Sequence, residues 1–330
     1  MSSVDKKIIK SKAWKLNKQT ILIGASIVVS IVLFYVNSKY KIVLSKNKSK
    51  SSIQNSNSNA PKYCIYVEND DLYVLDTAVK VLDLLGLKRA DFAEGNQINE
   101  DCSLYWTYDN PFELDYNFEQ LEYHQRINHI PGNYALVSKS ILGTTTDSKY
   151  IPKAFTNSED LQKYAELNPE KRFVQKFKNN RGVELKKASE MNFTKSASLT
   201  NYFGQEFIEN PLLFEGHKFD MGIYVVITSV NPLRFYYYSE SFMIRLCSRP
   251  YNPNNFDDIK TYVINDEHIT GVNFKKIKEY YNKSYSYKAA MNAYFTEKGY
   301  DMSKVWNQVE DCIRTVIVSR NDYFMDKVSN

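Results

Sequence analysis

Basic side chains beside strand-like segments offer the clearest candidate chemistry in this sequence. Lys176 lies inside the apolar run FVQKF, just before a turn that contains one glycine. Lys218 precedes Asp220 by two residues, at the start of a long β-branched and aromatic stretch, and Arg245 closes that stretch. Cations fixed on strands beside a glycine turn can hold phosphate groups by charge and through backbone N–H groups. The alternative interpretation is that each lysine is a solvated edge residue that discourages sheet aggregation.

Other catalytic and metal-binding patterns are missing from the sequence. It contains no nucleophile elbow, Walker loop, GxGxxG or HExxH motif. The four cysteines form no CxxC pair and have no histidine at zinc-ligand spacing, so a zinc site is not expected. Four cysteines allow three disulfide connectivities, and the spacing of Cys64, Cys102, Cys247 and Cys312 favours none of them.

Hydrophobic periodicity predicts the strands and helices that would position these residues. YCIYV, after Pro61, predicts a strand, and residues 78–87 predict a helix that ends near Gly86. Residues 223–229 and 233–241, separated by a short turn, predict a β-hairpin. Residues 301–320 predict an amphipathic helix, and its apolar face consists of Val305, Val309, Cys312, Ile313, Val316 and Ile317. The mixture of elements indicates an α/β fold.

The first sixty residues have the pattern of a membrane anchor followed by a linker. Residues 20–36 form an uncharged apolar run with lysines on both sides, and ~17 residues can cross a thin hydrocarbon layer. We expect a basic tail at 1–19 and an uncleaved signal anchor at 20–36. A cleaved signal peptide fits less well, because the small-residue cleavage pattern after the run is poor. A buried helix also fits less well, because lysines flank the apolar run on both sides. Residues 37–60 predict a polar linker, and residues 61–330 a globular domain.

The charge distribution bears on partners and on location. Much of the net charge of +5 lies in the first fifty residues, which indicates a membrane flank and not a nucleic-acid surface. Because lysines are similarly frequent on both sides of the run, the positive-inside rule favours a lumenal domain only slightly. We therefore expect a single-pass membrane protein, and the side of the domain stays open. Glycosylation sequons begin at Asn47, Asn192 and Asn282.

Three ordered motifs resemble the tubulin tyrosine ligase-like family over roughly Trp106 to Arg320. The first is WTYDNPFE followed by QRINHIPGNYALVSKSIL, and the second is FVQKF. The third is GQEFIENPLLFEGHKFDMGIYVVITSVNPLRFYYYSESFMIR. The resemblance implies an α/β fold of the ATP-grasp type, preceded here by a single N-terminal transmembrane helix.

The resemblance also implies roles for individual residues. Positions that bind ATP or its phosphates are matched by Lys139, Lys176, Gln205, Lys218 and Asp220, and an arginine of the active cleft is matched by Arg245 as the catalytic candidate. The family uses ATP and magnesium to phosphorylate a carboxylate, which an amine then attacks to form an amide bond. The implied amino acid is glutamate, and the implied acceptor is tubulin or another acidic protein tail.

Departures from the family pattern leave two functions open. Gly222 stands where the family has the arginine of its KFDLR motif, and the turn KNNRGVEL is short and poor in glycine. The family's magnesium carboxylates lie on strands beyond the position of Asn330, so we assign no metal ligand and expect a C-terminally incomplete domain. The chain is then either an ATP-dependent ligase of the tubulin polyglutamylase type or a membrane-anchored member that binds a nucleotide or protein partner without catalysis.

Overall fold

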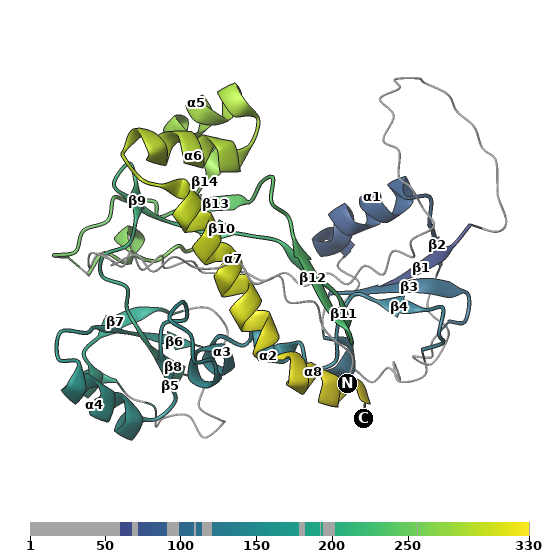
Figure 1. Cartoon of the computed structure of the whole chain (residues 1–330), viewed down its shortest axis with the longest axis horizontal. Coiled ribbons are helices and arrows are strands. Elements are labelled where there is room, and N and C mark those ends of the chain that lie inside the picture. The colour runs from purple at the N-terminus through teal and green to yellow at the C-terminus, as the bar shows by residue number, and fades with distance from the viewer. Residues whose placement is uncertain are drawn as a thin grey trace, which may run out of the picture.

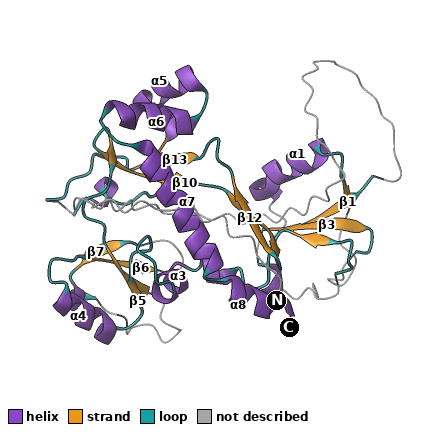
Figure 2. Ribbon diagram, in the orientation of Figure 1, coloured by secondary structure: helices purple, strands orange, loops and turns teal. Residues whose placement is uncertain are grey.

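The computed structural model describes residues 60–67, 72–90, 99–108, 110–113, 121–177, 182–191, 193, 202–255 and 257–329. These residues form a mixed α/β structure with three four-stranded sheets and one two-stranded ladder (Figures 1 and 2). The expected anchor at 20–36 and nearly all of the expected linker lie outside the described residues, and the domain boundaries stay predictions. Within the described ranges, no helix has the length and apolarity needed to cross a bilayer.

The first sheet is parallel and has the order β2-β1-β3-β4. Its strands are β1 (Lys62–Tyr66), β2 (Lys88–Ala90), β3 (Cys102–Thr107) and β4 (Arg126–Ile127). A 3-10 turn at Leu72–Leu75 and helix α1 (Asp76–Leu84) connect β1 to β2, as a parallel pair requires. Gly86 follows the helix with φ +83°, a conformation that favours glycine. The strand and helix expected here are confirmed.

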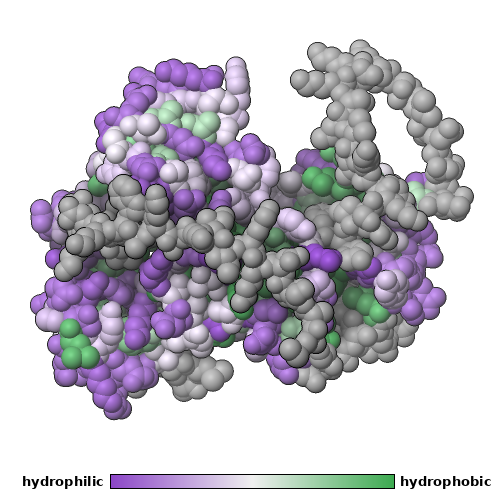
Figure 3. All heavy atoms as spheres, viewed as in Figure 1, coloured by the Kyte–Doolittle hydropathy of each residue, from purple (hydrophilic) through white to green (hydrophobic). Residues whose placement is uncertain are grey.

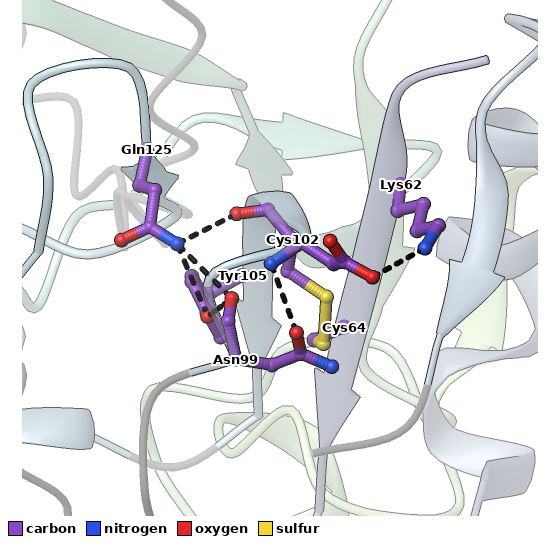
Figure 4. The surroundings of a disulfide bond; sticks show 7 residues. Lys62, Cys64, Asn99, Cys102, Tyr105 and Gln125 are labelled. Atoms are coloured by element: carbon purple, nitrogen blue, oxygen red, sulfur yellow. Dashed lines mark hydrogen bonds and ion pairs between the residues drawn. A yellow bond between two sulfur atoms is a disulfide. The ribbon is translucent and has the colours of Figure 1, made fainter. Parts of the chain in front are cut away.

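A disulfide joins the two central strands of this sheet. Cys64 in β1 is bonded to Cys102 at the start of β3, and neither side chain is exposed (Figure 4). Strand alternation explains the placement, because Tyr63 and Ile65 pack with α1 while Cys64 packs on the opposite face with Tyr105. Beside the disulfide, Gln125 Nε2 donates to the carbonyl oxygen of Cys102 at 2.9 Å. The structure thus contains one disulfide, and because Cys247 and Cys312 are unpaired, it forms none of the three connectivities that would pair all four cysteines.

We expect loss of this disulfide to destabilise the parallel sheet. The bond closes a loop with a sequence separation of 38, which in the chain-entropy model corresponds to about 4 kcal/mol. A Cys64→Ala/Cys102→Ala variant should therefore unfold at lower urea concentration than the oxidised wild-type chain, and a thiol reductant should no longer affect it. A Cys247→Ala variant is the control, since Cys247 is buried without a disulfide and the effect of the reductant should persist. Equal urea midpoints for the oxidised and reduced wild-type chains would contradict the prediction.

The second sheet is antiparallel, with the order β5-β8-β6-β7. It consists of β5 (Ala154–Phe155), β6 (Phe173–Phe177), β7 (Glu184–Lys186) and β8 (Tyr202–Glu206). Helix α4 (Ser158–Leu167) covers one face, where Leu161 packs against Phe155 and Phe173. The strand expected at FVQKF is confirmed. Alternation places Lys176 on the face opposite Phe173, away from α4.

The third sheet, β14-β13-β10-β9, is antiparallel throughout. It contains β9 (Leu213–Phe214), β10 (His217–Gly222), β13 (Met243–Leu246) and β14 (Ile269–Thr270). The expected hairpin is confirmed as β11 (Val225–Val230) and β12 (Leu233–Tyr237), although its second strand ends earlier than residue 241. This hairpin forms its own ladder, because the chain leaves the third sheet after Gly222 and returns to it at Met243.

Helix α7 (Met302–Val318) organises the largest core. It confirms the helix expected at 301–320, and the Asp301 side chain caps it by accepting from Ser303 N at 3.1 Å. All six predicted apolar-face residues are buried against β10, β11, β13 and neighbouring helices. Figure 1 shows α7 running diagonally across the molecule. The remaining helices are α2 (Tyr134–Val137), α3 (Lys139–Thr145), α5 (Lys275–Ser284), α6 (Tyr287–Glu297) and α8 (Asn321–Ser329).

Candidate nucleotide-binding site

Lys176 and Gln205 form the part of the site that the second sheet contributes. Lys176 Nζ donates to Gln205 Oε1 at 2.6 Å, and Gln205 Nε2 donates to the carbonyl oxygen of Pro152 at 2.9 Å. The register explains the first bond, because Gln205 lies opposite Val174, two residues along the same face from Lys176. The glutamine is fixed at its amide nitrogen, so its oxygen holds the lysine amine on the sheet surface.

Asp220 and Arg245 form an ion pair across the third sheet. They lie directly opposite each other in β10 and β13, with Arg245 Nε 3.0 Å from Asp220 Oδ1 and Nη2 2.6 Å from Oδ2. Asp220 is only 5% exposed, so water screens this pair poorly. The planar guanidinium satisfies both carboxylate oxygens, which fixes the orientation of both side chains.

Lys218 projects from the same face of β10 as Asp220. Its Nζ donates to the carbonyl oxygen of Tyr262 at 2.8 Å and lies 5.3 Å from the ring centroid of Phe207. Loss of hydration lowers the pKa of Lys218, while the nearby Cys247 and Asp220 act in the opposite direction. The ammonium group of Lys218 is held by a backbone oxygen and by the face of an aromatic ring. Neither of these two interactions involves a carboxylate.

Lys139 approaches the ion pair from a helix start. It is the first residue of α3, where backbone N–H groups disfavour a nearby cation. Loss of hydration lowers the pKa of Lys139, the charge of Arg245 lowers it further, and Asp220 partly opposes both. The helix start and the charge of Arg245 thus both disfavour the protonated form of Lys139.

Lys176 links the two sheets electrostatically. Its pKa is lowered to about 7, mainly by loss of hydration and then by the charges of Lys139 and Lys218. Hydrogen bonds join Lys176 to Gln205 and Asp220 to Arg245, while Lys139 and Lys218 are linked to these residues through the effect of nearby charges on lysine pKa values. Their individual roles stay predictions. Four of the six are cations, and the single carboxylate among them is already paired with Arg245. A polyanion would relieve the mutual repulsion of the lysines.

We expect the protein to become more stable as the pH rises from 6 to 9. In the unfolded chain a lysine keeps its proton up to about pH 10.4, whereas Lys176 releases it near pH 7 in the folded protein. Between these pH values the unfolded state binds more protons, so raising the pH favours folding. Below pH 7 Lys176 is protonated in the folded protein, so the full cost of burying its charge beside other lysines is present. Urea unfolding at several pH values tests this, and a Lys176→Met variant should show a flatter dependence. A fall in stability over this range would refute it.

The Asn-His-x-Pro-Gly motif fixes the loop that leads to Lys139. Asn128 Oδ1 accepts from Thr107 N at 3.0 Å, and Asn128 Nδ2 donates to Thr107 O at 2.9 Å. His129 Nε2 lies 3.1 Å from the same carbonyl oxygen, which can only accept, so this nitrogen carries the proton. Asn133 Nδ2 then donates to His129 Nδ1 at 2.9 Å. These bonds attach the loop to the end of β3.

Gly222, at the end of β10, lies where the family has an arginine. It faces Met243 across the ladder, and a Cβ at position 222 would lie 3.1 Å from Met243 Cε. Met243, two residues before Arg245 in β13, and Thr270, opposite Arg245 in β14, line a hollow of about 340 Å³. A second hollow of about 740 Å³ lies between α4 and β7. None of the six cluster residues lines either hollow. The methionine therefore occupies space beside the position where the family has an arginine.

The described residues do not fit a magnesium site. Among them, no three His, Cys, Asp or Glu side chains lie close enough together to hold a metal ion. Asp220 is committed to Arg245 through both of its carboxylate oxygens. Magnesium prefers carboxylate and water oxygens in an octahedral arrangement, and the part of the chain that the structure describes does not offer enough carboxylates for it around the cluster.

The sequence did not indicate the groups that hold the lysines in place. The carbonyl oxygens of Pro152 and Tyr262 are backbone atoms, so no residue type marks them. Phe207 follows Gln205 by two residues, and its ring position depends on a contact with Tyr262. An aromatic residue shortly after a predicted polar site residue was the only available signal.

Comparisons with known proteins show what this sequence is similar to. The sequence profile of the tubulin-tyrosine ligase family matches residues 118–330. A Caenorhabditis elegans protein named probable tubulin polyglutamylase ttll-15 is 32% identical over 243 residues, which cover 70% of this chain and 47% of that protein. The Mus musculus tubulin polyglutamylase TTLL6 is 27% identical over 248 residues, covering 67% of this chain and 28% of its own length. This chain thus spans about half or less of the length of these relatives.

Proposed function

The chain belongs to the tubulin-tyrosine ligase family, and we propose from this premise that it is an ATP-dependent amino-acid ligase with an ATP-grasp-like cleft. The proposed reaction joins glutamate through an amide bond to an acidic protein tail, which is tubulin or a protein of similar composition. Relatives named as tubulin polyglutamylases support the choice of amino acid and acceptor.

The observation that carries the proposal is the convergence of Lys139, Lys176 and Lys218 from three separate elements. Each of them has a lowered pKa with loss of hydration as its main cause. Charged groups are rarely held together in this way for stability alone, and perturbed pKa values gather at functional sites. The triphosphate of a nucleotide supplies the negative charge that this arrangement lacks.

In this proposal, the residues of the chain orient and neutralise the nucleotide. ATP, when bound, supplies the phosphoryl group that activates a carboxylate. Lys176 and Lys218 contact phosphate oxygens as ammonium ions, and Gln205 keeps Lys176 on the sheet. Lys139, which matches an ATP-binding position of the family, adds a third positive charge whose pKa responds to Arg245, the candidate arginine of the active cleft. The described residues assign no step to magnesium.

A second function is favoured by one specific observation. Asp220, the carboxylate within the cluster, has both oxygens bonded to Arg245 and is therefore a poor metal ligand as it stands. A cation cluster of this kind can bind a nucleotide without transferring its phosphoryl group. The second candidate is accordingly a family member that binds a nucleotide or a protein partner without catalysis.

Two measurements on the full chain separate these functions. A thermal-shift titration compares ATP with adenosine, in the presence and absence of magnesium. Stabilisation by ATP but not by adenosine supports phosphate binding, because the cluster recognises charge. Transfer of labelled glutamate to a glutamate-rich peptide then tests ligation. ATP binding with no transfer under both metal conditions supports the second candidate, and no response to ATP overturns both nucleotide proposals.

A further inference from the structure

All four cysteines of the chain are either oxidised or shielded in this structure. Cys64 and Cys102 form the buried disulfide between β1 and β3 (Figure 4). Cys247 and Cys312 are buried and unpaired. Burial raises the pKa of both of these thiols to about 11, so very little of either is the reactive thiolate near neutral pH. The chain therefore presents a stable oxidised pair and no exposed thiol that would form a wrong disulfide.

A buried structural disulfide of this kind is typical of proteins that fold in an oxidising compartment. The cytosol keeps thiols reduced, and cytosolic disulfides are mostly transient and catalytic. Neither Cys64 nor Cys102 belongs to the cation cluster, and both are 0% exposed, so an exchange role at the surface is not available to them. The bond is thus structural, and its formation needs an oxidant during folding.

An exposed sequon provides an independent observation. Asn282, Lys283 and Ser284 form an Asn-x-Ser triplet at the end of α5, and all three are exposed. The helix packs inward through Ile277 and Tyr280, so Asn282 points away from the core. Helices α5 and α6 form an outlying corner of the molecule in Figure 1, and the outer rim over them is hydrophilic in Figure 3. A glycan on Asn282 would therefore extend into solvent.

From these observations we infer that the globular domain folds outside the cytosol, in the lumen of the secretory pathway, and that Asn282 is an N-glycosylation site there. The pairing of Cys64 with Cys102 releases two protons and two electrons, and the disulfide of a lumenal oxidoreductase accepts them and becomes a dithiol. At Asn282 the amide nitrogen forms a bond to the first sugar of a lipid-linked oligosaccharide. The bond from that sugar to the lipid diphosphate breaks, and the amide loses one proton.

The inference narrows the acceptor, and in this respect it rests on the proposed function. A ligase domain on the lumenal side does not meet cytosolic tubulin. Its acceptor is then a carboxylate-rich protein or peptide of the lumen or cell exterior, attracted by the positive charge of the proposed site. The relatives named as tubulin polyglutamylases would share the fold and the chemistry, while the acceptor differs with the compartment.

The test uses the full-length chain expressed in animal cells. An amidase that removes N-glycans should increase its gel mobility and convert Asn282 to aspartate, which mass spectrometry detects. An Asn282→Gln variant should migrate one glycan step faster than wild type before digestion, whereas Lys283→Arg keeps the sequon and should migrate as wild type. Because Asn282 is exposed, neither substitution should affect folding.

Thiol trapping supplies the second readout. Cells are quenched in acid, and the denatured protein is alkylated without reduction. We expect a cross-linked peptide pair containing Cys64 and Cys102, with alkylation at Cys247 and Cys312 only. Recovery of four alkylated cysteines, or the absence of a glycan on Asn282, overturns the inference. Neither readout depends on ATP or on ligation, so failure here is distinguishable from failure of the proposed function.

Discussion

A Lys176→Met variant is expected to bind ATP about 10- to 100-fold more weakly than the wild-type chain and yet to be more stable against unfolding. The first effect follows from the loss of a charge-assisted bond to phosphate. The second follows because Lys176 loses hydration and is repelled by Lys139 and Lys218, costs that methionine does not have. The gain in stability should be larger at pH 6 than at pH 8, since the wild-type lysine is mostly charged at the lower pH.

The control for this prediction is the same substitution at an exposed lysine. Lys163 lies on α4 and forms an ion pair with Glu159 in which both side chains are largely exposed. Lys163→Met should change stability by less than about 0.5 kcal/mol and leave ATP binding unchanged. Calorimetric titration with ATP and urea unfolding give the two quantities. Wild-type affinity in Lys176→Met would remove Lys176 from the nucleotide site, and a fall in its stability would contradict the electrostatic account.

The second large effect concerns the ion pair across β10 and β13. An Asp220→Asn variant keeps the shape of the side chain but leaves the Arg245 guanidinium without its carboxylate, next to Lys139. Breaking a buried pair from one side costs about 3–5 kcal/mol, which corresponds to a fall in melting temperature of roughly 10 °C for a domain of this size. Differential scanning calorimetry measures the change.

A double-mutant cycle shows whether the cost comes from the unpaired charge. Asp220→Asn/Arg245→Met removes both charges and should recover most of the stability lost in Asp220→Asn. Glu159→Gln, which breaks the exposed pair with Lys163, should cost no more than about 0.5 kcal/mol. Additive effects of the two cluster substitutions would show that Asp220 and Arg245 do not depend on each other energetically.

Local elements of this fold could be predicted from the sequence because their signals are local. The apolar face from Val305 to Ile317 repeats with the helical period, and it became the buried face of α7. The turn at Asn231-Pro232 separates two runs of β-branched and aromatic residues, and these became β11 and β12. Each of these elements is specified by neighbours along the chain.

Long-range relations could not be predicted in the same way. Nothing near Asp220 indicates that its strand pairs with β13 and not with β11, because the choice depends on how the whole third sheet packs on α7. The partner of Cys64 was equally open, since cysteine spacing does not encode connectivity. For the site, the family resemblance suggested the six residues, which stay predictions, whereas the electrostatic effect of Lys139 and Lys218 on Lys176 is visible only in three dimensions.

Between β10 and β13 the chain leaves the third sheet and forms the β11–β12 hairpin, so one short stretch of sequence supplies both the charged pair and a projecting arm. The two strands that carry Asp220 and Arg245 are paired directly, while everything between them folds back as the β11–β12 arm. The tip of this arm, Asn231 and Pro232, is exposed. Insertions at this tip should be tolerated without changing the register that places Asp220 opposite Arg245. The tip of the arm is thus a suitable site for inserting a reporter peptide or a foreign recognition loop, because the pairing of Asp220 with Arg245 would not change.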